Sequence, residues 1–204
     1  FDKFQFECPM SLDEIALQNQ LNSPKEVYRS YSNAVLEFMN EASDSLIIYQ
    51  LDENSLSQVH RQLPRVYKKD PVSHNGIDIK EFKESGKLDN YLSNMGADYF
   101  MVISRYKILR KLITSRGSYN SAGGFTNWSI HQVDYEVYDK EGKLVALADR
   151  FTIRPRNPRS DNYQTEGVVL ADLNKGMRQL GKDLEYKLLK SRKKGKVVYK
   201  STFD

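Results

Sequence analysis

The chain has 204 residues, of which 39% are hydrophobic and 28% charged, and its formal net charge is +4. This composition is too apolar for a disordered chain, and no apolar run approaches the roughly 20 residues that a membrane-spanning helix needs. The single cysteine, Cys8, excludes an internal disulfide framework and any multi-cysteine zinc site. The length suits one globular domain.

Charge is unevenly distributed along the chain. Residues 1–60 contain three Lys or Arg against ten Asp or Glu, whereas residues 61–204 contain 28 against 17. Such an excess can form a surface for phosphate, anionic lipid or an acidic partner, but a solvated face with a solubilising basic tail gives the same pattern. The candidate binding surface consists of basic and aromatic residues: Arg105, Lys107, Arg110, Lys111, Arg116, Tyr119, Trp128, Arg150, Arg154, Arg156 and Arg159.

The first half of the chain is predicted to contain two strands and several helices. Residues 3–8 alternate apolar and polar side chains, which predicts a half-buried strand with Cys8 as a small buried residue. Ser11 to Glu14 and Ser23 to Glu26 both fit a capping box, and they begin predicted helices near 11–21 and 24–41. A strand is predicted at 45–50, and a short helix from about Asp52 to Gln62, before Pro64. Turn dipeptides mark residues 68–76.

The second half gives stronger predictions. A helix is expected over 79–95, closed by a C-cap glycine at Gly96, and the strand over 98–109 is apolar enough to be central in a sheet. Strands at 128–139 and 143–154 are joined by a hairpin turn at Asp139–Gly142, and loops are expected at 115–124 and 154–164. Apolar residues at helical spacing predict a helix over 166–190, in which Gly176 and Gly181 allow close backbone approach.

These elements predict an α+β fold with a single mixed or mainly antiparallel sheet and helices packed chiefly on one face. The three helices 24–41, 79–95 and 166–190 are expected to cover that face. We expect one domain over residues 1–192, followed by a basic C-terminal extension over 193–204.

Little in the sequence indicates catalysis. His60, His74 and His131 fall on different predicted elements and form no metal-binding spacing, so no metal site is predicted. Asp134 and Glu136 could serve acid–base hydrolysis, but strand alternation explains them as the solvated face of the sheet. Nucleophile-elbow, phosphate-loop and dinucleotide-binding motifs are absent from the sequence. We therefore predict a protein that is not an enzyme and that needs no cofactor.

The basic residues of the 105–116 stretch are interleaved in the sequence with Tyr106 and followed by Tyr119 and Trp128. Proteins that bind single-stranded nucleic acid combine such cations with aromatic rings that stack on bases. The sequence holds no RNP-type motif or GXXG clamp. A nucleic-acid-binding module, then cytoplasmic, using the basic 105–116 and 150–159 segments, is therefore the alternative function.

One passage resembles a known family. A helix ending in Leu92-Ser-Asn-Met-Gly96 and running into Ala97-Asp-Tyr-Phe-Met-Val-Ile103 is similar to the "LGADYVVVG" passage of bacterial envelope proteins. These are the amino-terminal domain of TolB and the periplasmic domain of CsgG-type lipoproteins. In those folds a long hairpin follows, matched here by 133–145, and a long closing helix, matched by 169–188.

This resemblance covers residues 78–188 and has consequences for function. It implies a secreted, lipid-anchored protein of a Gram-negative envelope, located in the periplasm or on the outer membrane, with no catalytic residues to carry over. Phe1 is not an initiator methionine, and a removed signal peptide, a lipidated cysteine or a trimmed tag would leave such an end. The expected partners are other envelope proteins, a second copy of the chain, or an anionic surface. The predicted function is docking on partner proteins or on the envelope surface.

Overall fold

A computed structural model describes residues 4–6, 13, 16–17, 20–52, 54–55, 59, 63–114, 125–153 and 168–201. In chain order its elements are β1 (Phe4–Phe6), α2 (Pro24–Ala42), β2 (Arg65–Lys68), β3 (His74–Ile77), α4 (Lys80–Glu84), α5 (Lys87–Met95), β4 (Phe100–Thr114), β5 (Phe125–Tyr138), β6 (Leu144–Ile153) and α6 (Val168–Lys194). The predictions for Cys8, His60, the box at 11–14 (Asp13 excepted) and the loops 115–124 and 154–164 lie outside the described residues.

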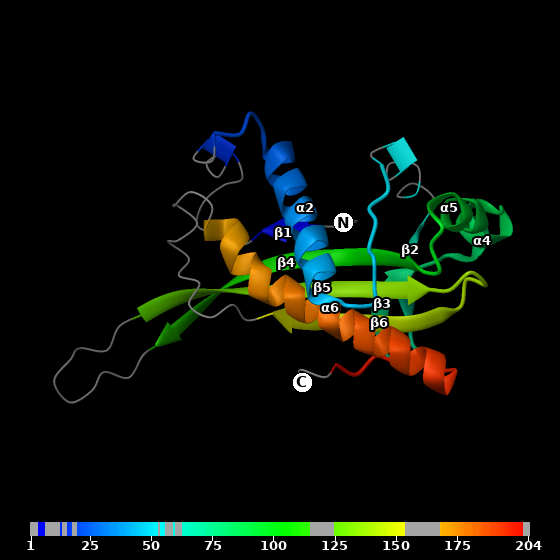
Figure 1. Ribbon diagram of the computed structural model, residues 1–204. Helices are drawn as coiled ribbons and strands as arrows, with labels where there is room; N and C mark the ends of the chain where they lie inside the picture. The colour runs from blue at the N-terminus through cyan, green and yellow to red at the C-terminus, as the bar shows by residue number, and fades with distance from the viewer. Residues whose placement is uncertain are drawn as a thin grey trace.

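The main sheet has the strand order β1-β4-β5-β6 (Figure 1). β1 runs parallel to β4, whereas β4, β5 and β6 are antiparallel, so the predicted α+β fold with a mixed sheet is confirmed. The sheet is not single, because β2 and β3 form a separate two-stranded sheet. The turn between β5 and β6 is also as predicted. Gly142 adopts a positive φ of 70°, and its N–H donates to the Asp139 carbonyl at 3.0 Å.

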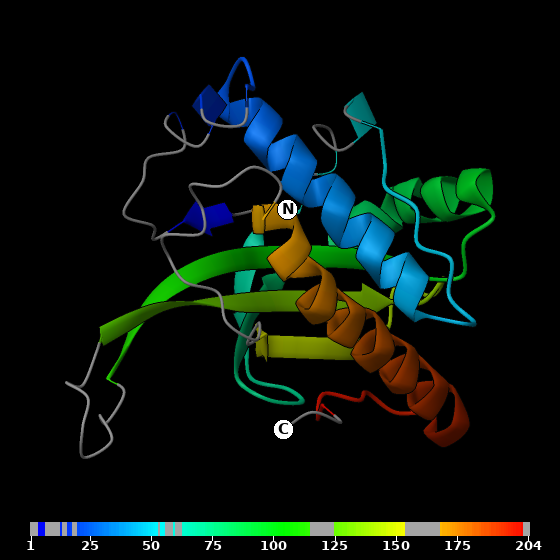
Figure 2. The ribbon, with the colours of Figure 1, turned by 60° about the vertical axis from the view of Figure 1, so that its left-hand side comes forward.

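The two long helices, α2 and α6, lie side by side on one face of this sheet (Figures 1 and 2). Val133, Tyr135 and Val137 of β5 point into the core beneath them and are each about 1% exposed. The helices approach closely at Gly181, because a Cβ atom there would lie 2.6 Å from the Met39 carbonyl oxygen. The predicted close approach is therefore confirmed at Gly181.

The opposite face carries elements that the sequence did not place there. The β2–β3 hairpin crosses behind the sheet (Figure 2), in the region where only turn dipeptides were expected. The 79–95 region was expected beside the long helices, but α4 and α5 contribute Phe82 and Leu88 to a second core with Phe100 and Tyr138. The alternation of β5 explains this difference, because Tyr138 points away from the face that carries Val137.

The strand predicted at 45–50 is wrong, because residues 46–51 form neither strand nor helix. Here the Asn40 side chain replaces a neighbouring strand. Its amide nitrogen donates to the Ile48 carbonyl at 2.9 Å, and the Ile48 N–H donates to its Oδ1 at 2.7 Å. An apolar segment can therefore satisfy its backbone groups without joining the sheet.

The start of α2 and the end of α6 each differ from the prediction in one respect. Pro24 begins α2 as predicted, but Ser23 makes no side-chain cap; instead the Asn22 N–H donates to the Glu26 carboxylate at 3.0 Å. α6 continues to Lys194, beyond the predicted end. After it, Val198 forms a parallel bridge to Ala146 of β6 and is 7% exposed.

Candidate functional site: an apolar cavity at the sheet edge

Within the described part of the chain, the edge of the main sheet lacks a pairing strand at the start of β4. β1 pairs with β4 only between Tyr106 and Ile108, and no other described strand pairs with the β4 edge from Phe100 to Ser104. Residues 45–51, which we call the strap, cross over this edge between α2 and α5 (Figures 1 and 2). A cavity of about 630 Å³ lies between the strap and the sheet.

The cavity joins the two apolar cores around the uncovered edge. One wall consists of side chains from the helix-covered face, including Val35, Met39, Leu184 and Leu188. The other wall comes from the hairpin face, including Leu63, Ile77, Leu92 and Phe100. Small-molecule sites in proteins typically span about 300–1,000 Å³ and are lined mainly by apolar groups, so both the size and the lining suit a ligand.

Hydrogen bonds hold the strap at several points, and half-buried and exposed side chains alternate along it. Besides the bonds to Asn40, the Leu46 N–H donates to Ser43 Oγ at 2.9 Å. Leu46 and Ile48 are half-buried against the core, whereas Ile47 is 75% and Tyr49 is 59% exposed. The strap therefore covers the cavity with the half-buried Leu46 and Ile48, while the exposed Ile47 and Tyr49 also border it.

Large apolar side chains also surround the mouth of the cavity. Ile47, Tyr49, Met95 and Leu189 are all exposed and all line it. Scattered exposed apolar residues are normal, but a group of them around one opening is typical of a binding site. No sequence pattern indicates this cavity, since the strap, α5, β4 and α6 contribute residues that are distant in the chain.

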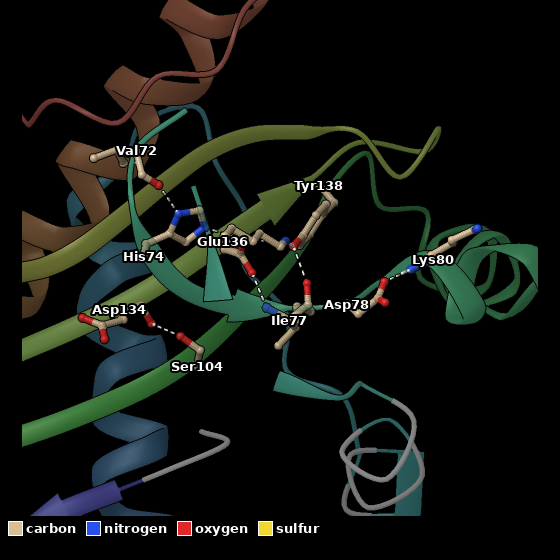
Figure 3. Close-up of polar contacts among 10 residues, drawn as sticks. Val72, His74, Ile77, Asp78, Lys80, Ser104, Asp134, Glu136 and Tyr138 are labelled. Atoms are coloured by element: carbon tan, nitrogen blue, oxygen red, sulfur yellow. Dashed lines mark hydrogen bonds and ion pairs between the residues drawn. The ribbon is translucent and has the colours of Figure 1, made fainter. Parts of the chain in front are cut away.

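Apart from the apolar cavity, a cluster of polar side chains lies on the face of β5 that the β2–β3 hairpin covers (Figure 3). Asp134 and Glu136 were expected to be solvated, but they are 2% and 1% exposed, so that prediction is wrong. The β2–β3 hairpin covers Glu136, whereas Asp134 is paired with Arg105 and with the Arg150 backbone N–H. His74 Nε2 lies 2.8 Å from Glu136 Oε1, and the Ile77 N–H donates to Oε2 at 2.8 Å.

The cluster around Glu136 is closed to a ligand. Lys68 Nζ donates to Glu136 Oε1 at 2.9 Å and to the Tyr138 hydroxyl at 2.8 Å, and a Cβ at Gly76 would lie 2.5 Å from the carboxylate. Burial raises the pKa of the Glu136 carboxyl, but the hydrogen bonds from His74, Lys68 and Ile77 outweigh it and hold that pKa below its ordinary value. Burial and the nearby Glu136 charge raise the pKa of Tyr138.

A second cluster of polar side chains is buried under α6. Lys187 and Asp183 are each 0% exposed and form an ion pair at 2.8 Å. Lys187 Nζ also donates to the Leu147 carbonyl and to the Tyr135 hydroxyl, both at 3.1 Å. Burial, followed by the Asp183 charge, raises the pKa of Tyr135 well above its ordinary value. These contacts tie α6 to β5 and β6, which is a structural role.

The candidate basic surface is only partly described. Arg105 forms an ion pair with the buried Asp134 at 2.6 Å, and the Arg150 backbone N–H donates to the same carboxylate at 2.7 Å. Lys107 is half-buried, and Tyr106 is 0% exposed in the helix-covered core, so its ring is not available for base stacking. Three further residues lie in β4 and β5, but their side chains are outside the described set: Arg110, Lys111 and Trp128. The remaining five lie wholly outside the described residues: Arg116, Tyr119, Arg154, Arg156 and Arg159.

The described residues contain no group of three or more His, Cys, Asp or Glu that could hold a metal ion. Within the same part of the chain, no helix is long and apolar enough to cross a membrane. Comparison with protein-family models, curated proteins and solved structures finds no match to this chain.

Proposed function

We propose that this chain is a non-enzymatic binding protein of the cell envelope, and that it docks on the envelope surface by taking one acyl chain of a lipid into the cavity. The observation that carries this proposal is the apolar cavity of about 630 Å³ with exposed apolar side chains at its mouth. Removing those side chains and an acyl chain from water together would drive binding.

An acyl chain suits this cavity better than a peptide. A peptide would bring one N–H and one C=O group per residue into a space lined mostly by apolar side chains, where an unpaired polar group is costly. The strap offers few backbone partners near Ile48, because the Asn40 side chain already bonds both the N–H and the C=O of Ile48. An acyl chain has no hydrogen-bonding groups to satisfy.

We propose a non-enzymatic protein because the buried polar side chains are already bonded to one another. The carboxylate of Glu136 receives hydrogen bonds from three groups, and Lys187 contacts three acceptors while it is fully buried. Such groups stabilise the fold and have no free capacity for a substrate. The periplasm-facing, lipid-anchored setting follows from the resemblance of the 92–103 passage to envelope proteins.

The proposal is tested by titrating the purified protein with 1-palmitoylglycerol, a neutral lipid with one acyl chain, in an isothermal titration calorimeter. We expect saturable binding with a stoichiometry of one. Ala97 lines the cavity, and Ala97→Phe should fill it and weaken binding at least tenfold. Ala42→Phe is the matched control, because Ala42 ends α2 and does not line the cavity. Absence of binding, or equal weakening by both substitutions, would overturn the proposal.

A further inference from the structure

We infer that the lipid bound in this cavity has an anionic headgroup, either a carboxylate or a phosphate, and that Arg192 binds this headgroup at the mouth. The inference rests on the proposed function, since it names the class of lipid that the same cavity takes.

Arg192 extends the apolar stripe of α6 that forms one wall. Leu184 and Leu188 are buried at 3% and 6% exposure, and Arg192 follows at the next fourfold step along the helix. Residues four apart lie on the same helix face, so Arg192 continues the wall and lines the cavity beside Leu188 and Leu189. Unlike the two buried leucines, Arg192 is exposed, which places its guanidinium at the solvent end of the wall.

The charges around the cavity leave Arg192 available for a ligand. Only two charged side chains line the cavity among the described residues, Arg192 and Asp98. Asp98 is paired with Lys140 at 3.1 Å, whereas Arg192 makes no ion pair within the part of the chain that the structure describes. Glu185, seven residues before Arg192 on α6, accepts a hydrogen bond from Ser45 Oγ of the strap.

A role for Arg192 in the helix alone does not explain its position. Basic residues in the last turn stabilise the negative end of the helix dipole, and α6 ends with Arg192, Lys193 and Lys194. Lys193 and Lys194 supply this interaction without lining the cavity. Arg192 is thus the one basic residue of that turn that adjoins the apolar space.

The residue type fits a carboxylate or a phosphate. A guanidinium presents paired N–H donors that match two oxygens of either group, and it stays charged at any physiological pH. A ligand with an apolar tail along Leu184 and Leu188 would bring its headgroup to Arg192. An exposed pair of this kind contributes modestly, so we expect a three- to tenfold preference for the anionic lipid.

The inference is tested with three lipids that share one palmitoyl chain: palmitate, palmitoyl lysophosphatidic acid and neutral 1-palmitoylglycerol. Calorimetric titrations give the affinity ratio of each anionic lipid to the neutral one. We expect a ratio of about three to ten for at least one anion in the wild type, and a ratio near one in Arg192→Gln. Lys193→Gln, which removes the same charge from the same helical turn, should keep the wild-type ratio.

Comparison of palmitate with the lysophosphatidic acid decides whether the headgroup is a carboxylate or a phosphate. Raising sodium chloride from 50 to 500 mM should reduce the preference, since exposed charges are screened. A ratio near one in the wild type, or a ratio that persists in Arg192→Gln, would overturn the inference while leaving the acyl-chain site intact. Failure to bind even the neutral lipid would instead overturn the proposed function on which the inference rests.

Discussion

His74 and Glu136 lie 62 residues apart in the sequence, and their side chains meet at 2.8 Å with 2% exposure each. Glu136 belongs to β5 and His74 to the hairpin that covers it, so this contact fastens the hairpin to the main sheet (Figure 3). The other ring nitrogen, Nδ1, donates to the Val72 carbonyl at 2.7 Å. The hairpin is therefore held by a buried ionic cluster, in addition to its apolar contacts.

Replacing Glu136 by glutamine should destabilise the protein by about 2–4 kcal/mol. The amide keeps the shape of the side chain but removes the charge that compensates Lys68, and its nitrogen cannot accept a hydrogen bond. Urea unfolding at pH 7 measures this loss. Glu81→Gln on the exposed side of α4 is the control, and a comparable loss in both variants would contradict the role given to Glu136.

The Glu136 carboxylate also makes the free energy of unfolding depend on pH. Its pKa in the folded state is below the ordinary value of 4.5, so the stabilisation is fully present above that value and is lost as the pH falls through the folded pKa. We expect the free energy of unfolding to fall between pH 5 and pH 3 more steeply in the wild type than in Glu136→Gln. Parallel pH profiles for the two proteins would show that Glu136 does not contribute to the acid sensitivity.

The buried pair of Lys187 and Asp183 makes a different prediction. Lys187→Met should cost about 3–5 kcal/mol, because it leaves the Asp183 charge buried without its cation. Adding Asp183→Leu removes that charge, so the double variant should lose much less than the sum of the two single losses. Urea unfolding of the four proteins gives the coupling energy as a double-mutant cycle. Additive losses would mean that the pair does not act as a unit.

The sequence predicted the long elements well, because each carries its own periodicity. The stripe that includes Leu180, Leu184 and Leu188 required a helix, and the alternation of β5 required a strand. The alternation did not show that both faces of β5 are buried. Glu136 appeared solvated because its partner His74 lies on a hairpin distant in sequence, in a stretch that showed only turn dipeptides.

The candidate site was harder to predict than the fold. The strap has the composition of a strand but departs from the sheet, and the side chains of Asn40 and Ser43 bond its backbone groups instead. The cavity results from that departure together with a β4 edge that β1 leaves uncovered. Neither feature has a local sequence pattern, since both depend on which segments meet in the folded chain.

The contact between Gly181 and Met39 sets the spacing of the two long helices. Alanine normally favours a helix interior over glycine by about 1 kcal/mol, yet Gly181→Ala should destabilise the protein by about 1–3 kcal/mol. The new Cβ would meet the Met39 carbonyl oxygen, which is backbone and cannot move aside cheaply. Thermal unfolding compared with Lys182→Ala, an exposed neighbour, measures the effect. A stabilised Gly181→Ala protein would show that α2 and α6 can separate freely.

Asn40 links the stability of the strap to the cavity below it. Asn40→Ala removes two hydrogen bonds to Ile48, which should lower the free energy of unfolding by about 1–2 kcal/mol. The effect should be largest in the strap, because among the described side chains Asn40 bonds both backbone groups of Ile48. Hydrogen exchange should therefore accelerate more in residues 45–51 than in β5, whose amides should lose only the protection that the lower free energy of unfolding removes.

Asn33→Ala, an exposed substitution on the same helix, serves as the control. If the strap is the cover of a lipid site, Asn40→Ala should also weaken binding of 1-palmitoylglycerol several-fold, since part of the binding energy would be spent on ordering the strap. If hydrogen exchange in the strap becomes faster but the lipid affinity stays unchanged, the acyl chain binds without the strap as its cover.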